Sequence, residues 1–223
     1  MTTIVTYVIL ACYPDKGMKS LGSKSLMMFH NKKLLDHQIS WIKKATNVNR
    51  EIIIVCDFDY PKIYKLFNFR AKVIEVKEFN PIYTACVNSK NENICFIDYG
   101  CMFTPDILKQ LEDTSTSRII TMKNNKDLDV GCICDDNKIE HMFFDLPENK
   151  FCNIFYLKEK EILAIKTHGF FKRKNLLYFE IINRLIENEY VINKKQVSLK
   201  DFIYFNNTRQ KNGISKFIKK NPN

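Results

Sequence analysis

Apolar runs alternate with amphipathic segments along the first half of the chain. Residues 4–11 form an apolar run rich in β-branched residues, which is typical of a strand buried on both faces of a sheet. Helical spacing or helix-start signals separate this run from the later ones. The expected strands lie at 4–11, 51–56, 71–76 and 93–99, and the expected helices at 34–42, 60–67, 82–89 and 104–113. This alternation predicts a parallel, doubly wound α/β sheet.

The pattern changes in the second half. Strand-like segments follow one another, with a hairpin turn expected at residues 135–137, before helical segments return. The expected strands lie at 118–122, 130–134, 138–144, 151–157 and 191–192, and the expected helices at 158–166, 176–187 and 208–220. No repeat or low-complexity linker interrupts the chain. We therefore expect one domain over residues 1–223, with a first half at 1–115 and a second half at 116–223.

A polar, basic loop follows the first expected strand. It carries the lysines Lys16, Lys19 and Lys24 together with Gly17 and Gly22. A central strand that leads into such a loop is a common way to present a phosphate site at the carboxyl end of a parallel sheet. The loop is therefore a candidate phosphate-binding segment.

Three short segments in this region carry a resemblance. They are Leu10-Ala11, residues 23–26 (SKSL) and residues 31–39 (NKKLLDHQI). In order and distance they resemble the signature of sugar-1-phosphate and phosphocholine nucleotidyltransferases, the NTP transferase family, which reads approximately L-A-A-G-x-G-x-R, P-K-x-L and G-K-x-L-L-x-x-Q-I. The resemblance implies a nucleotidyltransferase-like fold, which is Rossmann-like and of the GT-A type, with a mostly parallel mixed sheet flanked by helices. It covers residues 4–110 well and 118–220 loosely.

The resemblance also implies Mg²⁺ held by two aspartates, and here the sequence departs from the family. Residues 95–103 (CFIDYGCMF) match the segment h-h-N-G-D-h-h-F, and placing Gly100 on its glycine puts Cys101 at the aspartate position. A thiol is a poor Mg²⁺ ligand. Asp98 lies three residues earlier and would face the other way in an extended strand, so it can replace the ligand only if the backbone turns. The alternative is a strand-end acid bonded to backbone or a lysine.

Two further departures weaken the expected chemistry. Residues 12–17 (CYPDKG) stand where glycines would let backbone amides approach a triphosphate, and Tyr13-Pro14 cannot do so. Residues 201–208 (DFIYFNNT) match W-x-E-I-D-T loosely, so the uncharged Asn206 replaces the second aspartate. Lys24 is a candidate phosphate clamp, with solvent exposure as the alternative. The candidate catalytic residues are Lys24 and Asp98; the candidate nucleotide-binding residues are Leu10, Ala11, Lys16, Lys24 and Gly100; Asp98 is the candidate metal ligand.

The cysteines and histidines point to no other chemistry. Eight cysteines lack a C-x-x-C pair, and Cys56, Cys95, Cys132, Cys134 and Cys152 fall in expected strands. Buried free thiols in a reducing compartment, the cytoplasm, are therefore expected rather than disulfides or structural zinc. The four histidines are scattered, and His37 is expected on an exposed helix face. No apolar run is long enough to span a membrane.

Positive charge is concentrated at the end of the chain. The formal net charge is +10, and residues 158–223 hold 15 basic against 6 acidic residues. A solvated basic face is the expected explanation. The alternative is a docking surface for an acidic partner or a second copy of the chain; nucleic acid is not expected, because no binding motif is present.

Two functions remain open. The first is a Mg²⁺-dependent enzyme that transfers a nucleotide from an NTP, CTP or another, to a sugar-1-phosphate or phosphocholine, with Asp98 as the replacement ligand. The second is an inactive module of the same fold that serves as a binding or assembly protein. Because the glycines and both aspartates are missing, we expect catalysis to be weakened or lost.

Overall fold

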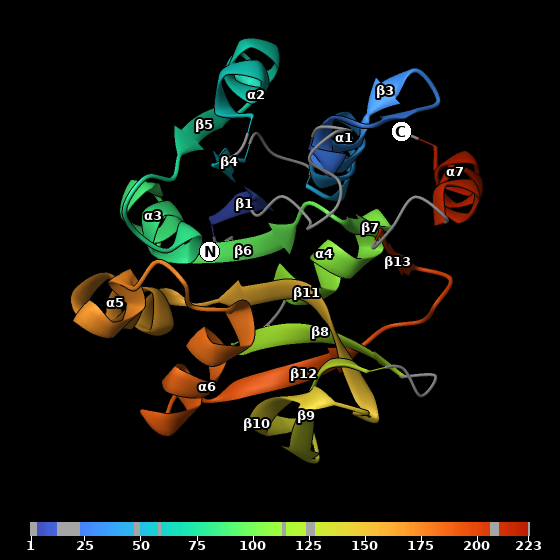
Figure 1. The fold of residues 1–223 in the computed structure, drawn as a ribbon. Coiled ribbons are helices and arrows are strands. Elements are labelled where there is room, and N and C mark those ends of the chain that lie inside the picture. Colours follow the sequence, from blue (N-terminus) through green and yellow to red (C-terminus); the bar gives the residue numbers. More distant parts are fainter. Residues whose placement is uncertain are drawn as a thin grey trace.

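A mixed sheet of nine strands forms the centre of the computed structural model, which describes residues 4–12, 23–46, 50–57, 59–112, 115–123, 128–205 and 210–222. Within these residues the strand order is β5-β4-β1-β6-β11-β8-β12-β10-β9, and helices cover both faces (Figure 1). None of the described helices is long and apolar enough to cross a membrane.

The first half of the sheet is parallel, as predicted. It contains β1 (Val5–Ala11), β4 (Ile52–Cys56), β5 (Lys72–Glu75) and β6 (Asn93–Asp98). The strand β1 lies between β4 and β6, and all seven of its residues are buried. An interior strand has no solvent-facing side, which explains its lack of polar alternation. The connecting helices are α1 (Leu34–Ala45), α2 (Tyr60–Phe67) and α3 (Pro81–Asn88).

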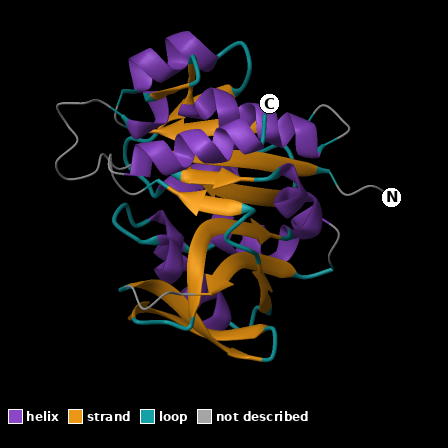
Figure 2. Ribbon diagram, turned by 90° about the vertical axis from the view of Figure 1, so that its right-hand side faces the viewer, coloured by secondary structure: helices purple, strands orange, loops and turns teal. Residues whose placement is uncertain are grey.

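The second half of the sheet is mostly antiparallel. Its strands are β8 (Ser117–Lys123), β9 (Asp129–Asp135), β10 (Lys138–Asp145), β11 (Asn149–Leu157) and β12 (Ile192–Gln196). The strand β11 is antiparallel to β6 and joins the two halves, and its first residues also pair with β9. These pairings close a ring of five strands. Figure 2 shows this strand-rich part below the more helical part of the molecule.

Two hydrophobic cores lie on opposite faces of the sheet. One contains residues of α1, α2, α4 (Pro105–Glu112) and α7 (Lys211–Lys220). The other contains residues of α3, α5 (Glu159–Thr167), the 3₁₀ helix η3 (Gly169–Lys172) and α6 (Tyr178–Glu187). Alternate residues of β1 face each core: Tyr7 and Ile9 the first, and Val8 and Leu10 the second.

Several short elements surround the carboxyl end of β6. The 3₁₀ helix η2 (Lys24–Leu26) precedes a hairpin of β2 (Met28–Phe29) and β3 (Lys32–Lys33). After β6 the chain turns and forms β7 (Cys101–Phe103), which pairs with β13 (Phe202–Tyr204) in a separate antiparallel ribbon. This ribbon brings the last quarter of the chain to the carboxyl end of β6.

Candidate functional site

The candidate site lies where β1 and β6 end side by side. Leu10 pairs with Asp98 in the parallel register, and the amide of Tyr99 donates a hydrogen bond to the Leu10 carbonyl at 3.2 Å. Because the strands are parallel, their carboxyl ends meet at one edge of the sheet. The structure thus brings Asp98 to the edge at which the basic loop begins.

The chain turns directly after Asp98. The strand β6 ends at Asp98, and β7 begins at Cys101. The buried side-chain amide of Gln38 donates to the carbonyls of Asp98, Tyr99 and Cys101, with nitrogen–oxygen distances of 3.0, 3.2 and 2.9 Å. Gln38 belongs to α1, in the third segment of the family resemblance. Helix α1 therefore fixes the turn that carries Asp98.

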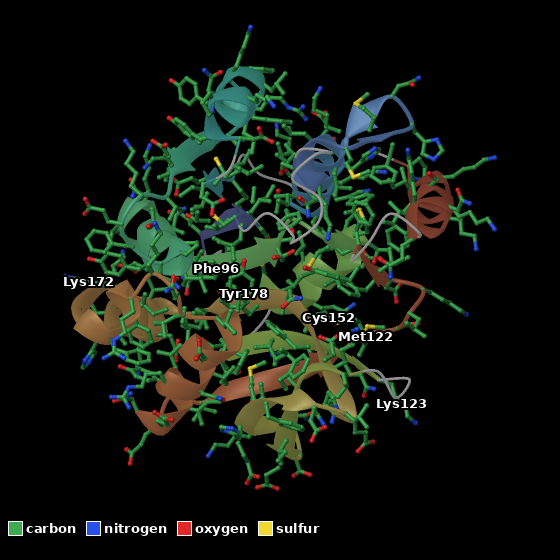
Figure 3. The ribbon with its side chains drawn as sticks, viewed as in Figure 1. Phe96, Met122, Lys123, Cys152, Lys172 and Tyr178 are labelled. Carbon is green, nitrogen blue, oxygen red and sulfur yellow. The ribbon has the colours of Figure 1, made fainter. Side chains whose placement is uncertain are left out.

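Asp98 is buried and bonded by three donors. Its Oδ1 accepts from the Gly100 amide at 2.8 Å and from the Tyr204 hydroxyl at 2.9 Å. Its Oδ2 accepts from the Tyr178 hydroxyl at 3.3 Å. Tyr178 is the first residue of α6, and its ring and that of Phe96 in β6 both pack against Phe155 (Figure 3). Both tyrosines are distant in sequence, so the carboxylate ties together β6, α6 and β13.

Burial dominates the ionisation of this carboxyl group. It raises the pKa of Asp98 to about 6, even though the hydrogen bonds from Gly100, Tyr204 and Tyr178 and the charge of Lys24 all act to lower it. The pKa of the Tyr204 hydroxyl is raised well above its usual value by burial and by the charge of Asp98. The hydroxyl of Tyr204 therefore stays protonated and donates to the carboxylate.

Lys24 lies close enough to this group for their charges to interact. Its side chain is buried, with Nζ 3.4 Å from the Phe205 carbonyl oxygen and 5.5 Å from the centre of the Phe205 ring. Burial lowers the pKa of Lys24, and the charge of Asp98 partly opposes this change. The alternative of a solvent-exposed lysine is wrong. Segments far apart in the chain, around residues 24, 98 and 204, thus form one buried polar cluster, which we call the Asp98 cluster.

The Cys101 thiol donates to backbone carbonyls of β11 and not to the Asp98 carboxylate. It is fully buried and lies 3.2 Å from the Cys152 carbonyl oxygen. Burial and the charge of Asp98 raise the pKa of Cys101 well above its usual value. A buried, protonated thiol is neither a Mg²⁺ ligand nor a nucleophile.

The other predicted site residues have mixed positions. Ala11 ends β1 at the site edge, but the Leu10 side chain packs into the core beneath α3 and α6. Gly100 is in close contact: a Cβ there would lie 2.9 Å from the Tyr204 ring and 3.2 Å from Asp98 Oδ1. Lys16, Asn206 and residues 13–17 lie outside the described residues.

The described residues do not fit the Mg²⁺ that the resemblance implies. Among them, no three His, Cys, Asp or Glu side chains come together in a way that could hold a metal ion. Both oxygens of Asp98 already accept hydrogen bonds. A Mg²⁺ ion requires ionised carboxylate oxygens in near-octahedral geometry, so it would have to compete with the tyrosine hydroxyls for this group.

The remaining sequence predictions have clear outcomes. The exposure predicted for His37 is wrong, because its ring is buried, its Nε2 lies 2.9 Å from the Phe29 carbonyl, and burial lowers its pKa. The hairpin backbone supplies this acceptor, which periodicity in α1 alone does not indicate. The prediction of free thiols is confirmed for all eight cysteines, seven of them buried.

Tyr178, Tyr204 and Gln38 are the residues that sequence reasoning missed. The hydroxyls of Tyr178 and Tyr204 reach Asp98 across 80 and 106 residues of sequence, respectively. A buried tyrosine needs a hydrogen-bond partner, but the sequence does not identify that partner. Gln38 lies within a matched motif, and only this position in the motif indicated that it could belong to the site.

The fold has close structural counterparts. Neither a protein-family model nor a curated protein sequence matches the chain. A CTP:phosphocholine cytidylyltransferase from Streptococcus pneumoniae superimposes with a TM-score of 0.72 at 15% identity, over 96% of this chain and 99% of that one. An inositol-1-phosphate CTP transferase from T. maritima gives a TM-score of 0.72 at 13% identity, over 97% of each chain.

A third structure, a CMP:2-keto-3-deoxy-manno-octonic acid synthetase complexed with CTP, gives a TM-score of 0.73 at 11% identity, over 98% of this chain and 99% of that one. Likenesses at such low identity concern architecture, and here they extend over nearly the whole of each chain. The predicted fold class is confirmed: this chain has the fold of the nucleotidyltransferases, a mixed α/β sheet flanked by helices.

Proposed function

We propose that the chain is a nucleotidyltransferase-fold protein that binds a nucleoside triphosphate at the Asp98 edge of the sheet, with its transfer activity weakened or lost. The ancestral reaction would be Mg²⁺-dependent transfer of a nucleotide to a sugar-1-phosphate or phosphocholine. The near-full-length likeness to cytidylyl-transferring enzymes supports the nucleotide part of this proposal. The free thiols fit a cytoplasmic location.

The state of Asp98 carries the proposal. A catalytic metal ligand needs an ionised carboxylate whose oxygens are open to the ion. Here two tyrosine hydroxyls and one amide occupy the oxygens, and the pKa of the group is raised to about 6. Binding Mg²⁺ would therefore require breaking the Tyr178 and Tyr204 contacts. This competition supports the proposal that catalysis is weakened.

Lys24 supports retention of the nucleotide site. It lies in the second matched segment and belongs to the Asp98 cluster, where the charge of its ammonium group acts to lower the pKa of Asp98. A phosphate group could replace the weak 3.4 Å contact between Lys24 Nζ and the Phe205 carbonyl.

Thermal shift measurements with CTP, UTP, ATP, GTP and dTTP, each with and without Mg²⁺, test the binding. We expect at least one triphosphate to raise the melting temperature without Mg²⁺, and Lys24→Ala to remove the shift. Lys43→Ala, on the exposed face of α1, is the matched control and should keep it. If no triphosphate shifts the wild type at millimolar concentration, the nucleotide proposal is wrong, and a binding or assembly module without nucleotide remains.

Pyrophosphate release tests the activity. Phosphocholine, glucose-1-phosphate and inositol-1-phosphate are offered as acceptors with the triphosphate that binds. We expect release far below the rate of about 1 to 10³ per second that is typical of enzymes. Tyr178→Phe and Tyr204→Phe should strengthen Mg²⁺ binding, since each frees part of the Asp98 carboxylate. A wild-type rate in the typical range would contradict the loss of catalysis.

A further inference from the structure

A groove lies between α7, β13 and the ends of β8 and β11, with a volume of about 620 Å³. We call it the basic groove, because five lysines line it: Lys123, Lys150, Lys200, Lys216 and Lys220. Figure 3 shows Lys123 at the end of β8, on the side of the molecule that carries β13 and α7. Tyr204, whose hydroxyl donates to Asp98, lines the groove, whereas Lys24 and Asp98 do not. The groove therefore adjoins the nucleotide site proposed above without including its two charged residues.

The charge of the basic groove is largely uncompensated. No Asp or Glu side chain is among its described lining residues. Lys150 forms an ion pair with Asp129, whereas the described part of the chain offers no carboxylate within ion-pair distance of Lys123, Lys200, Lys216 or Lys220. Several like charges around one concave surface focus a positive potential, which raises the local concentration of anions.

One face of helix α7 forms a wall of the groove. Gly213, Lys216, Phe217 and Lys220 recur at intervals of three and four residues and therefore share one face of the helix. Gly213 has room, since a Cβ there would meet Ile203 Cδ1 at 3.5 Å. Three of the 15 basic residues at positions 158–223 thus line this cavity: Lys200, Lys216 and Lys220.

The groove also has apolar surface. Met122, Phe202, Ile203 and Phe217 contribute to its lining. Ligand pockets typically have volumes of roughly 300 to 1,000 Å³ and combine such apolar walls with a few charged groups. Size and chemistry therefore match a small molecule with one charged end.

We propose that the basic groove binds a phosphate-bearing small molecule with an apolar or aromatic body. The lysine ammonium groups would contact the phosphate as point charges, and the apolar lining would cover the body of the molecule. A cavity of this size suits such a ligand better than a nucleic acid strand, which requires a track of stacking aromatic residues.

Pyridoxal 5′-phosphate is a suitable probe, because it combines a phosphate with an aromatic ring and reports the lysine it reaches. Its aldehyde condenses with a lysine amine to an imine and releases water, and added borohydride reduces the imine to a stable secondary amine. Peptide mass spectrometry then identifies the lysine. We expect the groove lysines to be labelled about tenfold faster than Lys172 and its near neighbour Lys174. Figure 3 shows Lys172 on the opposite side of the molecule from Lys123. Equal labelling of all exposed lysines would overturn the proposal.

Competition and variants define the ligand. Phenyl phosphate should block the labelling at about a tenth of the concentration that inorganic phosphate needs, because it also buries apolar surface. Equal competition by the two would overturn the apolar part of the proposal. Blocking by polyglutamate but not by phenyl phosphate would overturn the small-molecule proposal in favour of an acidic protein segment.

Equilibrium binding of pyridoxal 5′-phosphate, measured by absorbance without borohydride, provides an independent reading. The double variant Lys216→Gln/Lys220→Gln should weaken this binding about tenfold or more. The matched control Lys172→Gln/Lys174→Gln should leave it unchanged, and all four side chains are exposed, so folding is preserved. Lys24→Ala should also leave it unchanged, whether or not a triphosphate binds at the Asp98 cluster. Loss of groove binding in Lys24→Ala would show that the two sites are one and overturn the proposal.

Discussion

At the scale of single residues, burial of the ionised Asp98 carboxyl group destabilises the folded state. Burial raises its pKa to about 6 from the ordinary 3.8. Between these values the unfolded chain is ionised while the native carboxyl keeps its proton, so the native state binds more protons and stability falls as pH rises. The loss is complete above pH 6 and amounts to about 3 kcal/mol.

The Asp98→Asn variant removes this cost. We expect it to be more stable than the wild type by up to about 3 kcal/mol at pH 7.5, and by roughly half of that at pH 5. The asparagine oxygen can still accept from the Gly100 amide and Tyr204, and its amide can donate to the Tyr178 oxygen. Urea denaturation at both pH values measures the difference. A variant that is less stable at pH 7.5 would contradict the burial argument.

Gln38 acts on the same site by holding its backbone. Replacing it by methionine keeps the volume but removes the amide that donates to three carbonyls. Leaving buried carbonyls without this donor should destabilise the fold by about 1–3 kcal/mol. Chemical denaturation measures the loss, and Gln110→Met on the exposed face of α4 is the control, expected within about 0.5 kcal/mol of the wild type. Equal stability of the two variants would rule out the role assigned to Gln38.

The sequence identified the charged members of the Asp98 cluster but not the neutral ones. Lys24 and Asp98 stand out because charged residues next to apolar segments in a matched motif are unusual. Tyr178 and Tyr204 look like ordinary core aromatics, and their role depends on contacts between α6, β13 and β6 that are not local. An extended strand would place Asp98 and Cys101 on opposite faces, with Cys101 at the metal-ligand position. In the structure the chain turns between β6 and β7, so Asp98 lies in the polar cluster and Cys101 is buried.

At the scale of elements, the pairing of β9 with β11 depends on one glycine. A Cβ on Gly131 would lie 2.2 Å from Pro147 Cβ and 2.4 Å from the Asn149 carbonyl oxygen. Backbone cannot move away without breaking the pairs of β11 with both β8 and β9. We expect Gly131→Ala to destabilise the protein by about 2 kcal/mol or more.

Gly169→Ala is the matched control for this strand junction. A Cβ at Gly169 would meet no heavy atom within 4 Å, and its φ lies outside the left-handed region. The free energy of unfolding of this variant should stay within about 0.5 kcal/mol of the wild type. Thermal or urea unfolding measures the stability of both variants. If Gly131→Ala is as stable as the wild type, β9 and β11 separate at little cost.

The elements that were predicted well are those with a strong local pattern. The parallel strands are continuous apolar runs, and α2 begins with Pro61 in its first turn at the expected position. The strand β12 was predicted over two residues and extends over five, because Lys194 and Lys195 pair with β8 although their side chains give no strand signal. The ribbon of β7 and β13 was missed for a different reason. Its strands are only three residues long, and they pair across about 100 residues of sequence.

At the scale of the whole molecule, the parallel half carries the family resemblance and the antiparallel half carries the charge. The two halves meet where β6 pairs with β11, and there Phe96 stacks on Phe155 with ring centres 4.8 Å apart. The Asp98 cluster spans this junction, since Lys24 and Asp98 come from the first half and both tyrosines from the second. A change in how the halves meet would therefore act directly on the ionisation of Asp98.

The cysteines test the whole architecture at once. All eight are free, and Cys134 is the one that is partly exposed. Burial raises the pKa of the thiols of Cys86, Cys95 and Cys152 far above the usual value, so these groups are inaccessible and remain protonated. A short pulse of N-ethylmaleimide at neutral pH should therefore add one label to the native protein, at Cys134, and eight labels to the chain in guanidinium chloride without reductant.

Intact mass spectrometry counts these labels, and Cys134→Ser should abolish the fast reaction. Fewer than eight labels on the unfolded chain would reveal a disulfide and contradict the free thiols. Several fast labels on the native protein would mean that the sheet and its helices do not exclude water from both cores. Because the buried cysteines lie on both faces of the sheet, in β6, β7 and β11 as well as in α3, one count reports on the packing of both halves.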